Sequence, residues 1–154
     1  MRIWIDNDGC PRMVRDLIFK VSERRKIPVS VVANSHMHLP VSTRITMFVV
    51  PGTFDAADNY IAEHVEAGDL VITSDIPLAS RIVAKGALGL STRGDVFNKD
   101  NVQERLADRN LLQELRSAGD VTGGPPPLNE RDKKRFADAL DRIVSAVHLA
   151  APES

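Results

Sequence analysis

The first eleven residues, MRIWIDNDGCP, constrain the fold of this chain more than any other stretch. An apolar run at 3–5 leads directly into two carboxylates, Asp6 and Asp8, and Pro11 follows a glycine turn. This pattern predicts a buried strand that ends in acid and a helix that opens with proline. In open α/β sheets, ligand sites lie at the carboxyl ends of the strands. We therefore expect a functional site at the end of this first strand.

Strand and helix patterns alternate along the rest of the chain. Apolar residues at helical spacing, such as Val14, Ile18 and Val21, predict a first helix that ends before Pro28. Further strands are expected at 28–34, 44–50, 69–73 and 87–90, and helices at 54–68, 77–86, 99–117 (with a break near 108–110) and from 129; 91–98 is expected to be a polar loop. This order predicts an α/β fold, a single three-layer domain around a mostly parallel five-stranded sheet of PIN-like or Rossmannoid type, with a C-terminal helical pair.

The C-terminal third divides at a stretch rich in glycine and proline. Residues 1–118 are expected to form the α/β domain, 119–128 a linker, and 129–149 a helix docked on the same domain. Asn129 is expected to cap this helix. Its apolar face is expected to contain Phe136, Leu140, Ile143, Val144 and Val147.

Composition excludes several classes of protein. The chain has 154 residues, of which 43% are hydrophobic and 27% charged, as in a single globular domain. A net charge of −1 and an aromatic content of 5% argue against a basic or base-stacking nucleic-acid surface. The single cysteine excludes a disulfide framework, and we expect no disulfide-linked partner. No membrane span or signal segment is evident. We expect a cytoplasmic protein with no membrane contact, and the oligomeric state stays open.

Three groups of carboxylates fall at matching places in the predicted fold. Asp6 and Asp8 follow the first strand, Asp75 follows the strand at 69–73, and Asp55 and Asp58 begin the preceding helix. If those two strands are neighbours, up to five carboxylates line one cleft. Oxygen ligands without cysteine or a histidine pair suit Mg²⁺ or Mn²⁺, held by Asp6, Asp58, Asp75 and Asp55. Each acid also has a structural alternative, because aspartates commonly cap helices.

Candidates for substrate binding lie near the same strand ends. Lys85 and Arg93 are expected near the carboxyl edge of the sheet, where they could reach substrate phosphates. Asn34 and Ser74 complete this set.

Other chemically active residues are better explained by structure. His36 and His38 have the spacing of metal ligands but lie in a polar loop without a third ligand. Cys10 lies among acids and has no histidine partner, which favours a small packed side chain. The basic run at 133–135 is expected to be a solvated helix face.

Five segments in a fixed order carry a family resemblance: IDNDGCP, FDAADNYI, DLVITSDIPLA, GALGLSTRG and TGGPPPL. Together they resemble the YaiI/YqxD family of uncharacterised bacterial proteins, which is thought to be similar to PIN-like nuclease domains. The resemblance covers Arg2 to about Val147. It implies that Asp6, Asp58 and Asp75 bind metal, the last within a T-x-D-x-x-L motif that starts at Thr73.

The sequence departs from the family pattern at two places. The first motif usually reads DADACP, and here Asn7 and Gly9 replace the two alanines while both acids are kept. PIN-like nucleases usually have a further acid after the fifth strand, for which Asp95 is the nearest candidate.

The leading hypothesis is a metal-dependent nuclease-like protein that acts on RNA or another phosphodiester. Asp6, Asp8, Asp58 and Asp75 would be its catalytic acids, with Asp8 or Asp55 positioning water.

Two alternatives stay open. One is a phosphatase of the haloacid-dehalogenase type, with Asp6 as nucleophile, Asp8 as general acid, and Ser35 and Lys85 as weak stand-ins for its other residues. The other is a non-catalytic module that binds nucleic acid or protein. A dinucleotide fold is disfavoured, because acids occupy the place of the glycine-rich turn.

Overall fold

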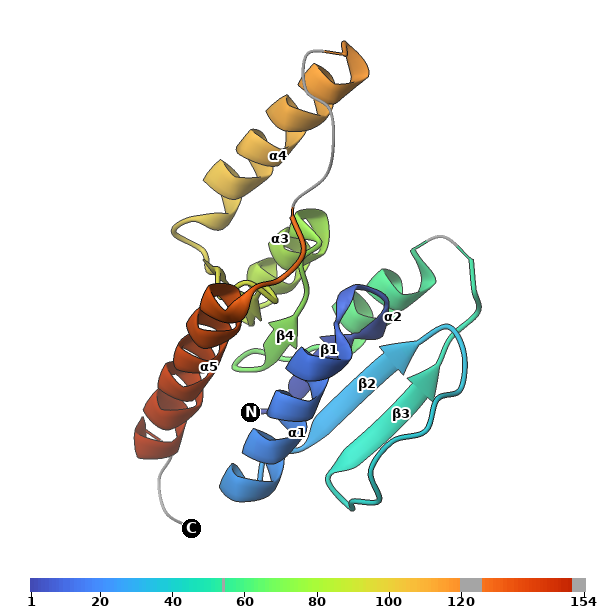
Figure 1. Cartoon of the computed structure of the whole chain (residues 1–154), viewed down its shortest axis with the longest axis vertical. Helices are drawn as coiled ribbons and strands as arrows, with labels where there is room; N and C mark the ends of the chain where they lie inside the picture. The colour runs from blue at the N-terminus through green and yellow to red at the C-terminus, as the bar shows by residue number, and fades with distance from the viewer. Residues whose placement is uncertain (54, 120–125, 151–154) are drawn as a thin grey trace.

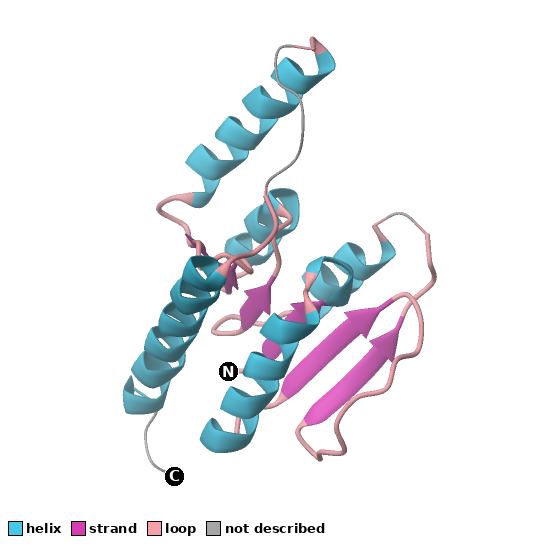
Figure 2. Cartoon of the chain, viewed as in Figure 1, coloured by secondary structure: helices cyan, strands magenta, loops and turns pink. Residues whose placement is uncertain are grey.

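The computed structural model describes residues 1–53, 55–119 and 126–150, with side chains up to residue 146. It has one six-stranded sheet between two helical layers (Figure 1 and Figure 2). The strands are β1 (Ile3–Asp6), β2 (Val29–Ala33), β3 (Ile45–Val49), β4 (Leu70–Ile72), β5 (Leu88–Leu90) and β6 (Val96–Phe97). The helices are α1 (Arg12–Arg25), α2 (Ala56–His64), α3 (Ile76–Ala84), α4 (Val102–Ser117) and α5 (Glu130–Ala150), and a 3₁₀ turn, η1 (Asn7–Gly9), follows β1.

The strand order is β3-β2-β1-β4-β5-β6, so β1 lies inside the sheet. It pairs in parallel with β2 on one side and with β4 on the other. The predicted α/β class, the three layers and the mostly parallel sheet are therefore confirmed. The first strand and the strand at 69–73 are neighbours, which meets the condition set above for one shared cleft. The chain order reverses at β1, which makes its carboxyl end a topological switch point.

Side chains of β1 alternate between two hydrophobic cores. Ile3 and Ile5 pack with residues of α1 and α5, whereas Trp4 packs with residues of α2 and α3. All four residues of β1 are buried. A strand covered on both faces needs apolar residues at consecutive positions, which explains the continuous apolar run before Asp6.

The first helix ends before Pro28 as predicted, whereas the second helix is shorter than predicted. Helix α1 stops at Arg25 because Lys26 adopts a left-handed conformation with a φ of 57°. Helix α2 covers only 56–64, because Asp55 is left-handed and Val65 is extended. The predicted helix of 54–68 was therefore too long, and its first residue, Phe54, lies outside the described residues.

The segment after β5 holds a strand that the sequence did not predict. Residues 96–97 form β6, which pairs antiparallel with β5, in place of the expected polar loop. Gly94 allows the intervening turn, because its φ is +93° and a Cβ there would lie 2.9 Å from the carbonyl oxygen of Arg135. This close approach packs the turn against α5.

Helix α4 is continuous, and the expected break near 108–110 does not occur. It packs on α3, yet Val102 is its one buried residue. Figure 1 shows that α4 extends away from the layered body of the protein. Its poor apolar periodicity reflects this exposure, because a helix without a buried face needs no apolar stripe.

Helix α5 covers the same sheet face as α1. The predicted cap is present, since the side chain of Asn129 accepts a hydrogen bond from the backbone N–H of Asp132. Phe136, Leu140 and Val144 are buried in the core shared with β1 and α1. The predicted linker falls largely on 120–125, and the predicted contact of Val147 concerns a side chain; both lie outside the part of the chain that is described. None of the described helices has the length and apolar character needed to cross a membrane.

Substitution of Leu140 by alanine should destabilise the whole domain. The side chain is fully buried, and truncation of such a leucine costs about 2–5 kcal/mol of unfolding free energy. Leu111→Ala on exposed α4 is the matched control, with an expected change within about 0.5 kcal/mol. Urea denaturation of both variants measures the difference. Equal effects would contradict the packing of α5 on the sheet.

Candidate functional site

The site is built around the last residue of β1. Asp6 lies between β2 and β4 and is only 9% exposed. Its Oδ2 accepts a hydrogen bond from the hydroxyl of Thr73, at 3.2 Å. The same hydroxyl accepts a hydrogen bond from the backbone N–H of Asp75, at 3.0 Å. Thr73, directly after β4, therefore links the two acids at the ends of neighbouring strands.

Asp75 has a structural role as well as a place in the site. Its Oδ1 accepts a hydrogen bond from the backbone N–H of Leu78, which caps helix α3. The helix-cap interpretation of this acid is therefore confirmed. Capping fixes the carboxylate at the carboxyl edge of the sheet, where it also borders the cavity described below.

The second pair of acids comes from the start of α2. Asp58 lies in the first turn of this helix. Asp55 precedes it at the cap position, but its side chain makes no capping hydrogen bond. Its positive φ of 63° places a non-glycine residue in a conformation that is costly for most side chains. The capping role considered for Asp55 is therefore not the one that the structure shows.

These acids border one cavity of about 350 Å³ at the carboxyl edge of the sheet. We call it the acid cavity. Five aspartates line it: Asp6, Asp8, Asp55, Asp58 and Asp75. The other described residues of its lining are Asn34, Pro51, Thr53, Ala56, Ala57 and Arg109. The five acids that the sequence singled out thus come from three separate segments and lie around one space.

Two of the carboxyl groups have strongly raised pKa values. Burial raises the pKa of Asp6 to about 6, the charges of Asp8 and Asp75 add to the rise, and the hydrogen bond from Thr73 offsets part of it. Burial, the largest cause, and the charges of Asp75 and Asp6 together raise the pKa of Asp58 to about 7. Asp58 also shares a hydrogen bond with Asp75, which favours its protonated form. The negative charges around the acid cavity therefore outnumber the positive ones, with five aspartates and one arginine among the described lining residues.

The donor set of the acid cavity matches a hard divalent cation in its chemistry. Only oxygen ligands surround the buried acids, as Mg²⁺ and Mn²⁺ prefer. As placed, however, no three histidine, cysteine, aspartate or glutamate side chains of the described residues stand close enough together to hold a metal ion. Thr73 holds Asp6, and the N-terminus of α3 holds Asp75, by hydrogen bonds.

Among the four predicted substrate-binding residues, only Asn34 lines the acid cavity. Ser74 lies nearby but hydrogen-bonds to Thr92. Arg93 pairs with Asp132 of α5 at 2.7 Å.

Lys85 lies at the opposite edge of the sheet, which corrects the expectation that it is near the strand ends. Helix α3 runs back from the carboxyl edge, and Lys85 follows its last residue. Its ammonium group donates hydrogen bonds to the carbonyls of Ala62 and Glu63, at the end of α2.

Asp95, the acid considered for the position after the fifth strand, has a structural role in ion pairs. Asp95 pairs with Arg135 at 3.3 Å and with Arg105 at 3.7 Å. It does not line the acid cavity, whose lining includes no residue between 76 and 108.

Arg109 is the site residue that the sequence did not suggest. It belongs to α4, and it lines the acid cavity although the helix extends away from the body of the domain. The sequence signal was present as an arginine in the stretch Asp108-Arg109-Asn110, which interrupts the apolar pattern. Only the tertiary placement of α4 shows that this position reaches the acids.

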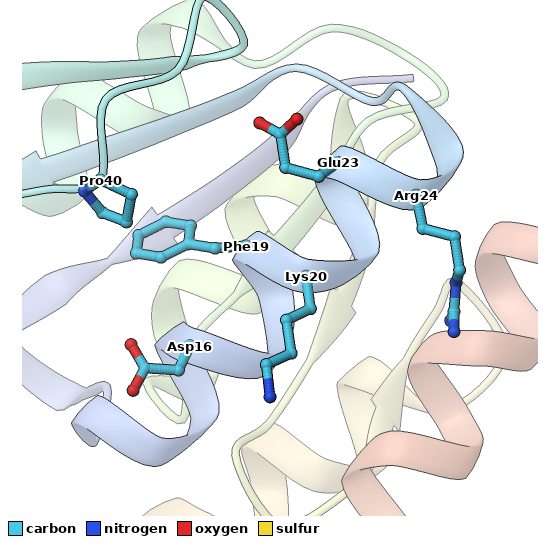
Figure 3. Close-up of a pocket in the computed structure, with 6 residues that line it drawn as sticks. All are labelled: Asp16, Phe19, Lys20, Glu23, Arg24 and Pro40. Atoms are coloured by element: carbon cyan, nitrogen blue, oxygen red, sulfur yellow. The ribbon is translucent and has the colours of Figure 1, made fainter.

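A second hollow of about 680 Å³ lies on the outer side of α1 and contains none of the predicted site residues. In Figure 3, the ring of Phe19 lies next to Pro40, and charged side chains surround them.

The two histidines of the loop after β2, His36 and His38, are exposed. Cys10 is buried, which raises the pKa of its thiol to about 12, so the expectation of a packed, unreactive side chain is confirmed.

The fold and the acid cavity define a class: a three-layer α/β domain with a carboxylate site at its topological switch point. The chain belongs to the YaiI/YqxD family, whose model, described as "Uncharacterized BCR, YaiI/YqxD family", matches residues 4–146. No solved structure matches the chain.

The relatives that match it over most of their length include three bacterial proteins, each named UPF0178 protein. Those of Citrifermentans bemidjiense and Trichlorobacter lovleyi are 52% and 51% identical over 145 residues, which is 94% of this chain and 94% of each relative. That of Xanthomonas campestris pv. campestris is 50% identical over 144 residues, 94% of this chain and 90% of the relative. The family resemblance noted in the sequence is confirmed.

Substitution of Asp58 by asparagine should stabilise the protein at pH 8. The pKa of Asp58 in the folded protein lies above its ordinary value of 3.8. The folded state therefore binds more protons than the unfolded state between about pH 4 and pH 7, and the free energy of unfolding falls as the pH rises through this range. An amide keeps the hydrogen bond to Asp75 without the charge. Allowing for solvent screening, we expect a gain on the order of 1 kcal/mol at pH 8.

Thermal denaturation at pH 4.5, 6 and 8 in metal-free buffer measures this effect. The matched control is Asp100→Asn, an exposed acid in the turn before α4. The Asp58 variant should lose part of the pH dependence that the control keeps. A decrease in stability at pH 8 would contradict the charge crowding inferred here.

Proposed function

We propose that this protein is a divalent-metal-dependent hydrolase that cleaves phosphodiesters, with RNA as the leading candidate substrate. One observation carries the proposal: carboxylates from three segments surround one cavity at the switch point, and two of them have raised pKa values. Crowded acids without paired cations cost stability, and proteins keep such clusters chiefly at functional sites. The likeness to PIN-like nuclease domains that the sequence implies agrees with this function. The proposal includes the cytoplasmic location expected from the sequence.

The proposed roles follow from the placement of each acid. Asp6, Asp58 and Asp75, with Asp55, would hold Mg²⁺ or Mn²⁺. A bound cation would neutralise charge on the scissile phosphate and lower the pKa of an attacking water. Asp8 is exposed in η1 and lines the acid cavity, so it is placed to orient a water that enters from solvent. Asn34 is placed to donate a hydrogen bond to the substrate.

The side chains would have to move closer together to share one cation. Asp6 and Asp58 are anchored on β1 and α2, which are rigid elements, so rotation about side-chain bonds is the movement required. Removal of mutual repulsion favours it, because a cation turns three like charges from a cost into ligands. Catalytic contacts are often loose before ligands bind.

The two alternatives have less support. A haloacid-dehalogenase-type phosphatase needs a lysine near its nucleophilic aspartate, whereas Lys85 is bound to α2 at the other edge of the sheet. No lysine is found among the described residues that line the acid cavity. A non-catalytic binding module would explain Asp75 as a helix cap. It gives no reason for the buried carboxyl of Asp6, which forms no ion pair with the residues that the structure describes.

Addition of Mn²⁺ or Mg²⁺ should raise the melting temperature of the protein at pH 8. A ligand at one hundred times its dissociation constant stabilises the folded state by about 2.7 kcal/mol. Asp6→Asn removes one proposed ligand while its amide oxygen can still accept the hydrogen bond from Thr73, so this variant should lose most of the shift. The exposed acid Asp100 again provides the control, because Asp100→Asn should keep it.

Hydrolysis of single-stranded RNA and of bis-p-nitrophenyl phosphate with Mn²⁺ tests the activity itself. Loss of a metal ligand should lower the rate about a hundredfold or more, a barrier change of roughly 3 kcal/mol. Metal-dependent cleavage that Asp6→Asn abolishes supports the proposal. Neither a thermal shift nor cleavage in the wild type would leave the non-catalytic module as the better account.

A further inference from the structure

Arg109 is the one cationic side chain among the described residues that line the acid cavity. It lies in the middle of α4, which packs on α3 next to the capped Asp75. Five aspartates border the same space. A guanidinium in such a place would be expected to pair with a carboxylate, since charge-assisted pairs of this kind are strong.

The guanidinium of Arg109 instead contacts neutral groups. Its Nη1 donates hydrogen bonds to the amide oxygen of Gln113, at 2.8 Å, and to that of Asn110, at 3.3 Å, both on α4 itself. No ion pair among the described residues involves Arg109. Arg105, one turn earlier, pairs with Asp95. The arginine of α4 that borders the acid cavity therefore has no ion pair among the described residues.

This arrangement separates negative and positive groups across one cavity. The carboxylates occupy the strand ends and the starts of α2 and α3, and Arg109 borders the space from α4. Five carboxylates repel the negative charge of a phosphate ester, and a cationic contact reduces this repulsion. A guanidinium is well suited to this contact, because its planar donors match two phosphate oxygens.

We propose that Arg109 is a substrate-binding residue that holds the phosphoryl group of a phosphate ester in the acid cavity. The proposal rests on the function proposed above, because it assumes that the carboxylates hold a cation. Arg109, which belongs to α4, would be the residue that selects an anionic substrate. The hydrogen bonds to Gln113 and Asn110 position the guanidinium in the absence of substrate.

Arg109 can be substituted with little effect on folding, because its side chain is exposed. Val102 is the buried residue of α4, and Arg109 is exposed, so its substitution leaves the core unchanged. We expect Arg109→Ala to change the free energy of unfolding by no more than about 0.5 kcal/mol. Arg116, in the last turn of α4, is exposed and does not line the acid cavity, which makes Arg116→Ala the matched control.

Isothermal titration calorimetry of the full chain at pH 8 tests the contact in two steps. Mn²⁺ is titrated first, and adenosine 5′-monophosphate is then titrated into the Mn²⁺-saturated protein, with adenosine as the ligand that lacks the phosphate. Arg109→Ala should weaken binding of the monophosphate about tenfold or more, as expected for loss of a hydrogen bond to a charged group. Arg109→Lys should recover part of this affinity. Arg116→Ala should bind as the wild type does.

The two titrations distinguish the failure of each proposal. Wild-type protein that does not bind Mn²⁺ would overturn the proposed function, and the role of Arg109 with it. If Mn²⁺ binds but Arg109→Ala and the wild type bind the monophosphate equally, or the wild type does not bind it, the role of Arg109 is overturned alone. Tighter Mn²⁺ binding by Arg109→Ala, with unchanged monophosphate affinity, would make Arg109 a counterion of the aspartates and would also overturn the proposal.

Discussion

Parallel pairing of β1 with both β2 and β4 is the constraint on which the rest of the structure depends. It requires a strand that is apolar on both faces, and Ile3, Trp4 and Ile5 meet this requirement by filling two separate cores. It also brings the carboxyl ends of β1 and β4 side by side, so that Asp6 meets Thr73 and, through it, Asp75. The site is therefore a consequence of strand order, because no local motif places these acids together.

Two buried aspartates at opposite edges of the sheet show what distinguishes the acid cavity. Asp69 accepts hydrogen bonds from the indole of Trp4 and from the backbone N–H groups of Arg2 and Glu66, so its charge is well satisfied. Asp6 receives one side-chain hydrogen bond, from Thr73, and faces further acids. Burial, only partly offset by this hydrogen bond, raises the pKa of Asp6 to about 6. Keeping these crowded carboxylates charged costs folding free energy, and a bound cation would be the simplest way to offset this cost.

Much of this was predictable from the sequence, and the exceptions have physical causes. The apolar run before Asp6 and the positions of Asp55, Asp58 and Asp75 were enough to predict the sheet and the gathering of acids. Strand β6 escaped prediction because two residues in a polar stretch carry no periodic signal. Lys85 was misplaced because a helix that starts at the carboxyl edge runs back across the sheet, so the residue after its last turn lies at the opposite edge. Arg109 was missed because it reaches the acid cavity through the tertiary placement of α4.

Crystals grown with Mn²⁺ at pH 8, and measured at a wavelength where manganese scatters anomalously, would show whether the acid cavity binds a cation. We expect an anomalous peak bordered by carboxylate oxygens of Asp6, Asp58 and Asp75, absent from crystals of Asp6→Asn. A fully charged acid cavity with no peak at saturating Mn²⁺, or a peak only at another surface, would contradict it.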